Sequence, residues 1–346
     1  MFSLWLLSFG ISQAQHYTWT GNSDTDWSNS SNWDLDNGNH PSTGDTVTIE
    51  TTSVPPTLTE DITISMIFML SDEAGIMMEE HTLTVSDSAV FSGTATVSVA
   101  GDQDTLILLG DCSSFENTTF DVPVKAICGS ILLNGSTFNA YGYFEQNGED
   151  RVSEGEGGNL FGDPTFLVIS NSGTFSISES ASNTFNGDVT IWSMEQNAKI
   201  YLSRFGANFN GNIYFNIMGT GESDEGEIFF GDVYGEEYYS ELAEGKVIAA
   251  GDSGMRSGSL CLIRFIQNGA TEQTLDLQGG VLDMKYCEFN GKLTINSQAP
   301  LLGYSTFNDT LVVSQTSNSA SVNWSGGNVF NGFTAVTNYS DNNLIF

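Results

Sequence analysis

Tyrosine and glutamate side chains gather in one short segment, and these residue types suit the recognition of neutral sugars. The candidate ligand-binding residues are Tyr234, Glu236, Glu237, Tyr238 and Tyr239. A tyrosine ring offers an apolar platform, and a carboxylate accepts hydrogen bonds from sugar hydroxyls. A short helix over 236–244, with its tyrosines packed on the rest of the protein, explains the same residues. The segment therefore predicts either a binding loop or a packed helix.

A second cluster has the oxygen-rich spacing of a calcium loop. Asp34, Asp36, Asn37 and Asn39 surround a glycine within six residues. Ca²⁺ prefers several carboxylate and carbonyl oxygens, so these four are the candidate metal ligands. The segment lacks the glutamate that closes an EF-hand loop, and solvated surface charge explains it equally well. Ca²⁺ is therefore a candidate cofactor and not an established one.

Signatures of catalysis are sparse. The sequence has no His-Glu-x-x-His, Gly-x-Ser-x-Gly or Gly-x-Gly-x-x-Gly motif. Asp276 and Asp283 flank the glycine pair at 279–280 and are candidates for the two carboxylates of a glycosidase. Lys285 and Lys292 are candidates for the base of a polysaccharide lyase. Solvated charge explains all four residues, so a carbohydrate-active enzyme stays an alternative function.

The charge balance restricts the partners. The 346 residues include 9 Lys plus Arg against 43 Asp plus Glu, which gives a formal net charge of −34. A surface so negative repels phosphate backbones, anionic membranes and acidic polysaccharides. We therefore expect no nucleic-acid partner and no polyuronate substrate, whereas cations and neutral sugars stay compatible.

A phenylalanine recurs along the chain, most often followed by Asn or Gly, and most gaps between successive copies are 23 or 24 residues. The anchors are Phe68, Phe91, Phe115, Phe138, Phe161, Phe185, Phe209, Phe230, Phe265, Phe289, Phe307 and Phe330. Alternating apolar residues at 189–192, 213–215, 293–295 and 311–313 follow four of them and predict short strands. A repeat of this length is typical of a solenoid whose coils share one core.

Each anchor is expected to point inward and to stack on its counterpart in the next coil. The Gly or Asn after it is expected to turn a corner through a positive φ. A leucine-rich solenoid has a similar period but needs leucines that this chain lacks. A β-sandwich array would not hold the Phe-Asn-Gly corner at a constant spacing. The favoured fold is all-β, a right-handed parallel β-helix with coils of about 23 residues.

The N-terminal segment carries Trp-Thr-Gly at 19–21, Asp-Trp-Ser at 26–28, Asn-Trp at 32–33 and Pro-Ser-Thr-Gly-Asp-Thr-Val-Thr-Ile at 41–49. In this order and spacing it resembles the tryptophan-rich start of secreted bacterial β-helix surface proteins, many of them exported by the type IX route. The resemblance covers residues 17 to 49. It implies a cell-surface or released protein, often adhesive and sometimes carrying a carbohydrate-active module. It also implies a structural cap, in which Trp19, Trp27 and Trp33 cover the first coil.

The two ends of the sequence suggest export and a longer chain. Residues 1–14 form a short apolar run with Ser12 and Ala14 where a signal peptidase prefers small residues. No Lys or Arg precedes the run, so a buried first strand is the alternative. The run is too short to span a membrane. The apolar end at 342–346 looks like a strand at which a longer chain has been cut.

Four cysteines are compatible with disulfides in an exported protein. Cys112, Cys128, Cys261 and Cys287 allow three pairings and include no Cys-x-x-Cys motif. Isolated buried thiols are the alternative.

These observations predict a signal peptide at 1–14, a tryptophan-rich cap at 15–50 and a β-helix at 51–346, truncated at its C-terminal end. The expected function is that of a secreted, extracellular or cell-surface module, structural or adhesive and non-catalytic, which binds a neutral glycan or a partner protein. Alternatives are a glycosidase or lyase, and a filament subunit that self-associates through its terminal coil. Neither nucleic-acid binding nor membrane insertion is expected.

Overall fold

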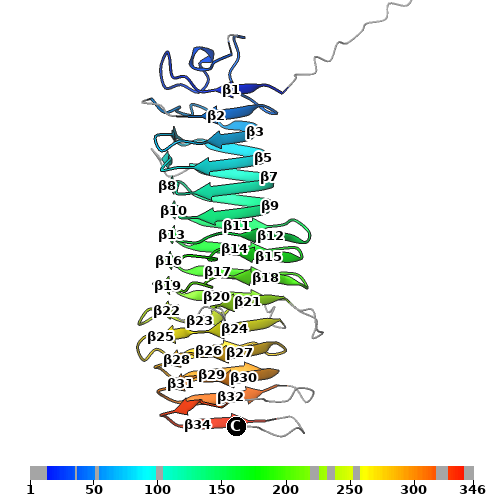
Figure 1. Cartoon of the computed structure of the whole chain (residues 1–346), viewed down its shortest axis with the longest axis vertical. Coiled ribbons are helices and arrows are strands. Elements are labelled where there is room, and N and C mark those ends of the chain that lie inside the picture. The colour runs from blue at the N-terminus through cyan, green and yellow to red at the C-terminus, as the bar shows by residue number, and fades with distance from the viewer. Residues whose placement is uncertain are drawn as a thin grey trace, which may run out of the picture.

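The computed structural model is a tall stack of short strands, with the first strands at one end and the last strands at the other (Figure 1). It describes residues 14–35, 37–50, 54–98, 104–218, 226–231, 238–251, 258–316 and 326–338. Within these residues the helical content is a single 3-10 turn, η1 (Ser30–Asn32). The protein is a parallel β-helix, as the repeat predicts.

Three sheets run along the stack, and a typical coil passes through them in the order sheet 1, sheet 2, sheet 3. Sheet 1 contains β1 (His16–Thr18), β2 (Thr46–Ile49), β3 (Ile62–Met69), β5 (Thr82–Ser92), β7 (Thr105–Glu116), β9 (Val124–Asn134), β11 (Gly142–Gln146), β14 (Thr165–Ile169), β17 (Val189–Ser193), β20 (Ile213–Ile217), β23 (Ile248–Ala250), β26 (Gln273–Asp276), β29 (Leu293–Ser297), β32 (Leu311–Gln315) and β34 (Thr334–Thr337). Sheet 2 contains β12 (Arg151–Glu154), β15 (Gly173–Ser176), β18 (Ala198–Tyr201), β21 (Glu227–Phe230), β24 (Ser259–Ile263), β27 (Val281–Lys285) and β30 (Ala299–Gly303). Sheet 3 contains β4 (Gly75–Met77), β6 (Thr96–Ser98), β8 (Thr119–Phe120), β10 (Thr137–Phe138), β13 (Leu160–Phe161), β16 (Asn183–Phe185), β19 (Ala207–Phe209), β22 (Ser240–Leu242), β25 (Phe265–Gln267), β28 (Glu288–Phe289), β31 (Thr306–Phe307) and β33 (Val329–Phe330).

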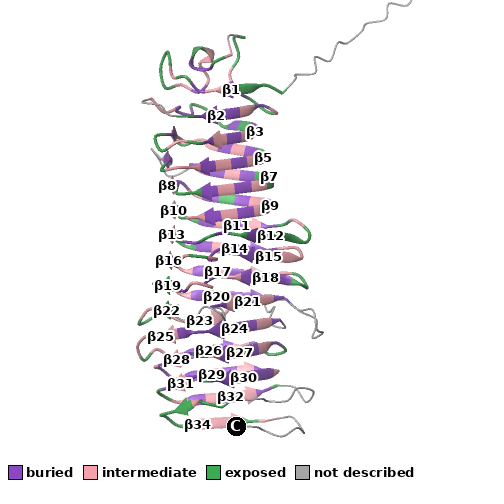
Figure 2. Ribbon diagram, viewed as in Figure 1, coloured by how far each residue is buried: buried purple, intermediate pink, exposed green. Residues whose placement is uncertain are grey.

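Neighbouring strands within a sheet belong to successive coils and pair in parallel. In sheet 1, for example, Thr165 lies beside Val189, and Val189 lies beside Ile213. The four strands expected from alternating residues are β17, β20, β29 and β32. Because the register keeps like positions together, inward residues of all coils form one continuous core, which Figure 2 shows as buried bands along the strands.

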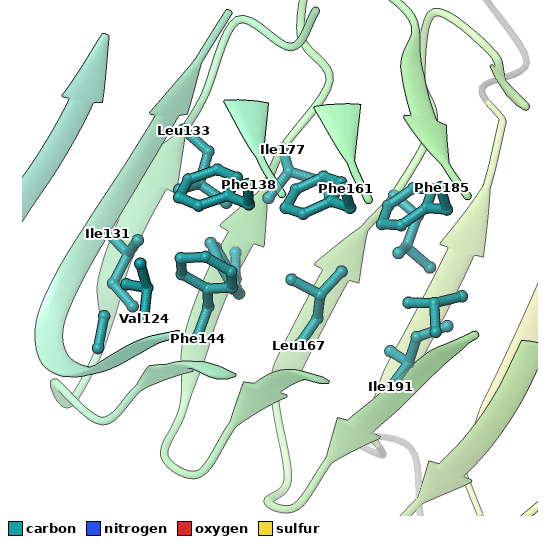
Figure 3. Packing of buried hydrophobic residues seen from close by; sticks show 14 of the residues in the cluster. Val124, Ile131, Leu133, Phe138, Phe144, Phe161, Leu167, Ile177, Phe185 and Ile191 are labelled. Atoms are coloured by element: carbon teal, nitrogen blue, oxygen red, sulfur yellow. The ribbon is translucent and has the colours of Figure 1, made fainter. Parts of the chain in front are cut away.

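A ladder of phenylalanines forms the sheet 3 side of this core. The inner ladder comprises Phe120, Phe138, Phe161, Phe185 and Phe209, all fully buried. Successive ring centroids lie 4.7 to 5.4 Å apart, and the rings are within 9° of parallel. Figure 3 shows Phe138, Phe161 and Phe185 in one row, opposite Phe144, Leu167 and Ile191 from sheet 1. Inward stacking of this part of the repeat is confirmed.

Five anchors lie outside the column at the sheet 3 corner, although two of them, Phe91 and Phe115, are buried and stack on each other with centroids 5.6 Å apart. Phe91 and Phe115 belong to β5 and β7 of sheet 1, and Phe68 is only half-buried beside the inward Met69. Phe230 lies in β21 of sheet 2, and Phe265 precedes the anchor position by two residues. Leu242 and Gln267 occupy the places that follow Phe209 in sheet 3. The coils differ in length. Phenylalanines that are equally spaced in the sequence therefore lie in different sheets in some coils.

The expected positive φ directly after the anchor phenylalanine is wrong in most coils: among the anchors followed by Asn or Gly, only Gly231 has one, at φ 83°. The glycines of the Phe-Asn-Gly corners lack it as well. Gly187, Gly211, Gly291 and Gly332 do not have a positive φ. Instead, a Cβ on Gly211 would lie 2.1 Å from the carbonyl oxygen of Gly187 in the preceding coil, and the other three are equally crowded by backbone. Glycine is needed here because successive corners pack directly on each other.

Asparagines of the same corners form a ladder on the outside. Asn308 Nδ2 donates to Asn290 Oδ1 at 2.7 Å, and Asn331 Nδ2 donates to Asn308 Oδ1 at 2.7 Å. Asn210 makes the equivalent bond to Asn186. The Phe-Asn-Gly triplet therefore provides a buried ring, an exposed amide bond between coils and room for the next corner.

The corner between sheets 1 and 2 changes along the stack. In β5, β7 and β9 it is only a bend within one long strand, with Gly110 at φ 147° in β7. From β11 onward a loop separates the two sheets, as between β11 and β12 (Figure 1).

The N-terminal tryptophans pack as one buried group. Trp33 meets Trp19 and Trp27 edge to face, with centroids 4.9 and 4.8 Å away, and all three belong to the same core cluster as the coils. Trp19 Nε1 donates to Val54 O at 2.8 Å, and Trp33 Nε1 donates to Trp27 O at 2.8 Å. The N-terminal indoles are thus buried and continuous with the core of the coils.

All four cysteines are free, and three of them are buried. Among the described residues, none of the helices is long and apolar enough to cross a membrane.

Candidate functional site

The predicted ligand-binding segment is described only in part. Tyr234, Glu236 and Glu237 lie outside the described residues. Tyr238 and Tyr239 are 44% and 45% exposed and directly precede β22, so residues 240–242 form a strand and not the alternative helix. The structure therefore places both tyrosines on the corner between sheets 2 and 3.

Tyr239 begins a row of four large side chains on successive coils of this corner. The pairing of Ser240 with Phe265 sets Tyr239 beside Arg264. The next pairings set Arg264 beside Tyr286, and Tyr286 beside Tyr304. We call Tyr239, Arg264, Tyr286 and Tyr304 the corner column. Tyr238 lies next to it, with its ring centroid 4.9 Å from that of Phe205.

Three side chains of the column, Arg264, Tyr286 and Tyr304, stack on each other along the rod. Arg264 Cζ lies 5.0 Å from the centroid of Tyr286, a cation–π arrangement. The Tyr286 and Tyr304 rings are 5.2 Å apart and within 12° of parallel. Gly327 follows Tyr304, and a Cβ there would lie 2.6 Å from that ring. Tyr286 and Tyr304 are nevertheless 39% and 54% exposed. The ring faces are thus largely occupied, while edges and hydroxyls reach solvent.

The column is held in an unusual backbone conformation. Arg264, Tyr286 and Tyr304 have φ of 54°, 58° and 54°, the left-handed region that bulky residues seldom adopt. Non-glycine residues persist there when the surrounding structure fixes them, and such positions concentrate at functional sites. Sequence reasoning found Tyr238 and Tyr239 but missed Tyr286 and Tyr304, because neither lies in an acidic or tyrosine-rich run.

Carboxylates flank the column on the outer face of sheet 3. Asn268 Nδ2 donates to Glu241 Oε2 at 3.3 Å, and Asn308 Nδ2 donates to Glu288 Oε1 at 3.1 Å. On the sheet 2 side, Lys285 pairs with Asp283 at 2.7 Å. The column and its neighbours therefore include aromatic rings, one guanidinium, several carboxylates and one ammonium group.

The predicted calcium loop uses its oxygens within the fold. Asp34 Oδ1 accepts a hydrogen bond from Thr18 N at 2.7 Å, and Asn37 Oδ1 accepts one from Asn39 N at 2.9 Å. Asn37 Nδ2 donates to Gln15 Oε1 at 2.6 Å. Asp36 lies outside the described residues. Within the residues that the structure describes, no three His, Cys, Asp or Glu side chains form a group able to hold a metal. Calcium binding by Asp34, Asp36, Asn37 and Asn39 stays a prediction.

The two candidate catalytic carboxylates belong to different sheets. Asp276 ends β26 in sheet 1, and Asp283 lies in β27 of sheet 2, on the other side of the corner at 277–280. Lys285 is paired with Asp283, and Lys292 with Glu272 at 2.5 Å. Asp283, Lys285 and Lys292 therefore take part in surface ion pairs.

Basic side chains of sheet 2 and its corners also form ion pairs between coils. Arg204 Nη1 contacts Glu179 Oε2 at 2.5 Å, and its guanidinium lies 4.0 Å from the centroid of Tyr201. Lys199 contacts Glu227 at 2.8 Å in the next coil. On this side of the rod, basic side chains are thus paired with carboxylates.

The chain matches no protein-family profile, no curated protein and no solved structure.

Proposed function

We propose that the chain is a non-catalytic, rod-shaped adhesive module of a secreted or cell-surface protein, and that the corner column binds a partner protein. One observation carries the proposal: four large side chains occupy equivalent positions on consecutive coils, three of them stack in one row, and the tyrosines at 286 and 304 are roughly half exposed. Export and a surface location belong to the proposal because of the N-terminal sequence.

The chemistry of the column favours a protein over a sugar. A sugar ring stacks on a free aromatic face, but Tyr286 already lies between Arg264 and Tyr304. The column instead presents ring edges and hydroxyls, whereas Arg264 is buried, at 7% exposure, and supports Tyr286 from within the stack. Tyrosine and arginine dominate the energetic centres of protein interfaces. Rigid stacking also lowers the entropy that these side chains lose on binding.

Adhesion of coated beads tests the proposal. Beads carrying the full chain are applied to intact cells and extracellular matrix from the source, and bound beads are counted. The double variant Tyr286→Ala plus Tyr304→Ala is expected to bind about tenfold less, because two contact rings are lost. Val312→Ala, outward on sheet 1, serves as the control and is expected to match the wild type.

Pretreatment of the target identifies the class of partner. Protease is expected to abolish adhesion, and periodate, which cleaves vicinal diols of sugars, is expected to leave it intact. The proposal is wrong if the double variant adheres like the wild type. It is also wrong if periodate, and not protease, removes the binding partner.

A further inference from the structure

A second aromatic surface lies on the outer face of sheet 1, away from the corner column. Tyr143, Phe166, Thr190 and Tyr214 form one row across β11, β14, β17 and β20. The row beside it contains Glu145, Val168, Trp192 and Asn216. We call Tyr141, Tyr143, Phe166, Trp192 and Tyr214 the aromatic face. Four consecutive coils thus carry large rings on one side of the rod.

These rings are not part of the core. They alternate along their strands with fully buried inward residues such as Phe144, Leu167 and Ile191, which Figure 3 shows on the inner side of the sheet. Tyr141 is 40% exposed, and the other four rings are half-buried. Met218 extends the apolar surface at 37% exposure. Partly exposed large apolar side chains gathered on one face of a protein indicate an interaction site.

The rings of this face are less closely stacked than those of the corner column. Tyr141 and Phe166 have centroids 5.7 Å apart at an interplanar angle of 51°, and Tyr143 and Phe166 have centroids 6.1 Å apart at 30°. Within the described residues, neither Trp192 nor Tyr214 forms a ring pair. The half-buried rings of Trp192 and Tyr214 are therefore not covered by another described aromatic ring.

A fixed carboxylate lies among the rings. Tyr143 Oη donates to Glu145 Oε2 at 2.7 Å, and Ser170 Oγ donates to Glu145 Oε1 at 2.6 Å. Burial and the neighbouring carboxylate raise the pKa of the Tyr143 hydroxyl, so it keeps its proton. Each oxygen of Glu145 retains a further lone pair for a ligand hydroxyl.

The face is nearly neutral on a strongly acidic molecule. Among the outward residues of β11, β14, β17 and β20 in these rows, Glu145 alone is charged, and Lys125 lies one coil away beside Tyr143. The formal net charge of the chain is −34. An anionic ligand or a second copy of the chain would be repelled by the rest of the surface, whereas a neutral ligand would not.

We propose that the aromatic face binds a neutral polysaccharide lying along the rod axis, with sugar rings on Phe166, Trp192 and Tyr214 and hydroxyls bonded to Glu145. Coils repeat every 4.8 Å or so, close to the length of one pyranose unit in an extended chain. This site goes beyond the proposed function, because it takes a different ligand on a different sheet.

Affinity electrophoresis and titration calorimetry with soluble polysaccharides test the site. The probes are a glucan, a mannan, a galactomannan and a xylan, with polygalacturonate as the acidic comparison. The wild type is expected to bind at least one neutral probe and not the acidic one. The double variant Phe166→Ala plus Trp192→Ala is expected to weaken that binding at least about tenfold, because the contacts of two rings with the bound sugar are lost.

Matched variants keep the result interpretable. Glu145→Gln retains the shape of the site and is expected to weaken binding by a smaller factor. Thr294→Ala plus Val312→Ala changes the same row of sheet 1 in later coils and is expected to bind as the wild type does. Thermal unfolding of each variant establishes that it is folded. The proposal fails if no neutral probe binds, or if the Phe166 and Trp192 variant binds normally. Adhesion that is sensitive to protease and to the Tyr286 and Tyr304 substitutions tests the corner column separately.

Discussion

The inner ladder and the corner column are built by the same repeat and differ in what surrounds them. Inside, Phe161 and Phe185 stack at 4.7 Å and are fully buried. Outside, Tyr286 and Tyr304 stack at 5.2 Å and are roughly half exposed. Both distances follow from coils that repeat at the spacing of adjacent strands.

Side chains that stack in register from coil to coil can therefore serve either stability or binding, depending on whether they are buried or exposed. A ring removed from water contributes chiefly stability, through its apolar area and its packing. An exposed ring at the equivalent position of each coil contributes little stability. Strand pairing nevertheless fixes its position as closely as that of a core residue. A β-helix can thus hold a long binding surface in a fixed geometry at little energetic cost.

Truncation of the inner ladder is expected to be severe. Phe185→Ala removes a ring that stacks on both Phe161 and Phe209. The free energy of unfolding should fall by about 3 to 5 kcal/mol, because a cavity replaces a buried ring. Urea unfolding followed by circular dichroism measures this change. A loss below about 1 kcal/mol, as expected for surface residues, would break the contrast between the two regions.

A methyl group added at a Phe-Asn-Gly corner is expected to be costly. Gly211→Ala places a Cβ 2.1 Å from the Gly187 carbonyl oxygen, so the stacked corners must separate. We expect a loss of about 1 to 3 kcal/mol in the free energy of unfolding. Gly326→Ala is the control, because nothing lies within 4 Å of the position that its methyl group would take, and its φ is not positive. Equal stability of the two variants would contradict direct packing of the corners.

Glycine should be better tolerated than alanine in the corner column. Tyr286→Ala loses the ring stacking but keeps the left-handed backbone at φ 58°. Tyr286→Gly loses the same stacking and is free of that strain, so it should be more stable than the alanine variant by about 1 kcal/mol. Thermal and urea unfolding of the pair measure the difference. Alanine equal to or better than glycine would mean that the backbone at 286 is not strained.

The buried thiols should resist alkylation until the protein unfolds. Burial raises the pKa of Cys128 to about 11 and that of Cys287 to about 12, from an ordinary value of 9.0. Because the folded-state values are raised, the contribution of these thiols to stability is intact below pH 9 and is lost as the pH rises toward 11 and 12. Iodoacetamide labelling read by mass spectrometry should modify the outward Cys112 first. Early labelling of Cys128 or Cys287 at pH 8 would show that the core opens.

The existence of the repeat could be predicted from the sequence. Which residues of successive coils lie beside each other could not. Phe138, Phe161, Phe185 and Phe209 fall at regular spacing because their coils are of similar length. Some coils have a long insertion, as before β22, and others have no loop at the first corner, as in β7. In such coils a phenylalanine at the usual spacing lies in a different sheet. Hydrophobic spacing reports that coils exist, whereas corner lengths decide which residues meet.

The candidate site was harder to predict than the fold. Tyr238 and Tyr239 stood out because they lie in a tyrosine-rich run, but Tyr286 and Tyr304 are separated from them by two or more coils. Their meeting depends on parallel pairing in sheet 3, which brings together residues distant in sequence. The rings of the aromatic face resemble ordinary strand residues, and only the register identifies them as neighbours.

The most direct test of the account measures unfolding free energy and bead adhesion on the same two variants. Tyr286→Ala plus Tyr304→Ala should lose about tenfold in adhesion and no more than about 2 kcal/mol in unfolding free energy. Phe185→Ala, at a temperature where it is still folded, should lose more stability and adhere as the wild type does. The account is contradicted if the two quantities fall together in both variants, or if the tyrosine variant adheres normally.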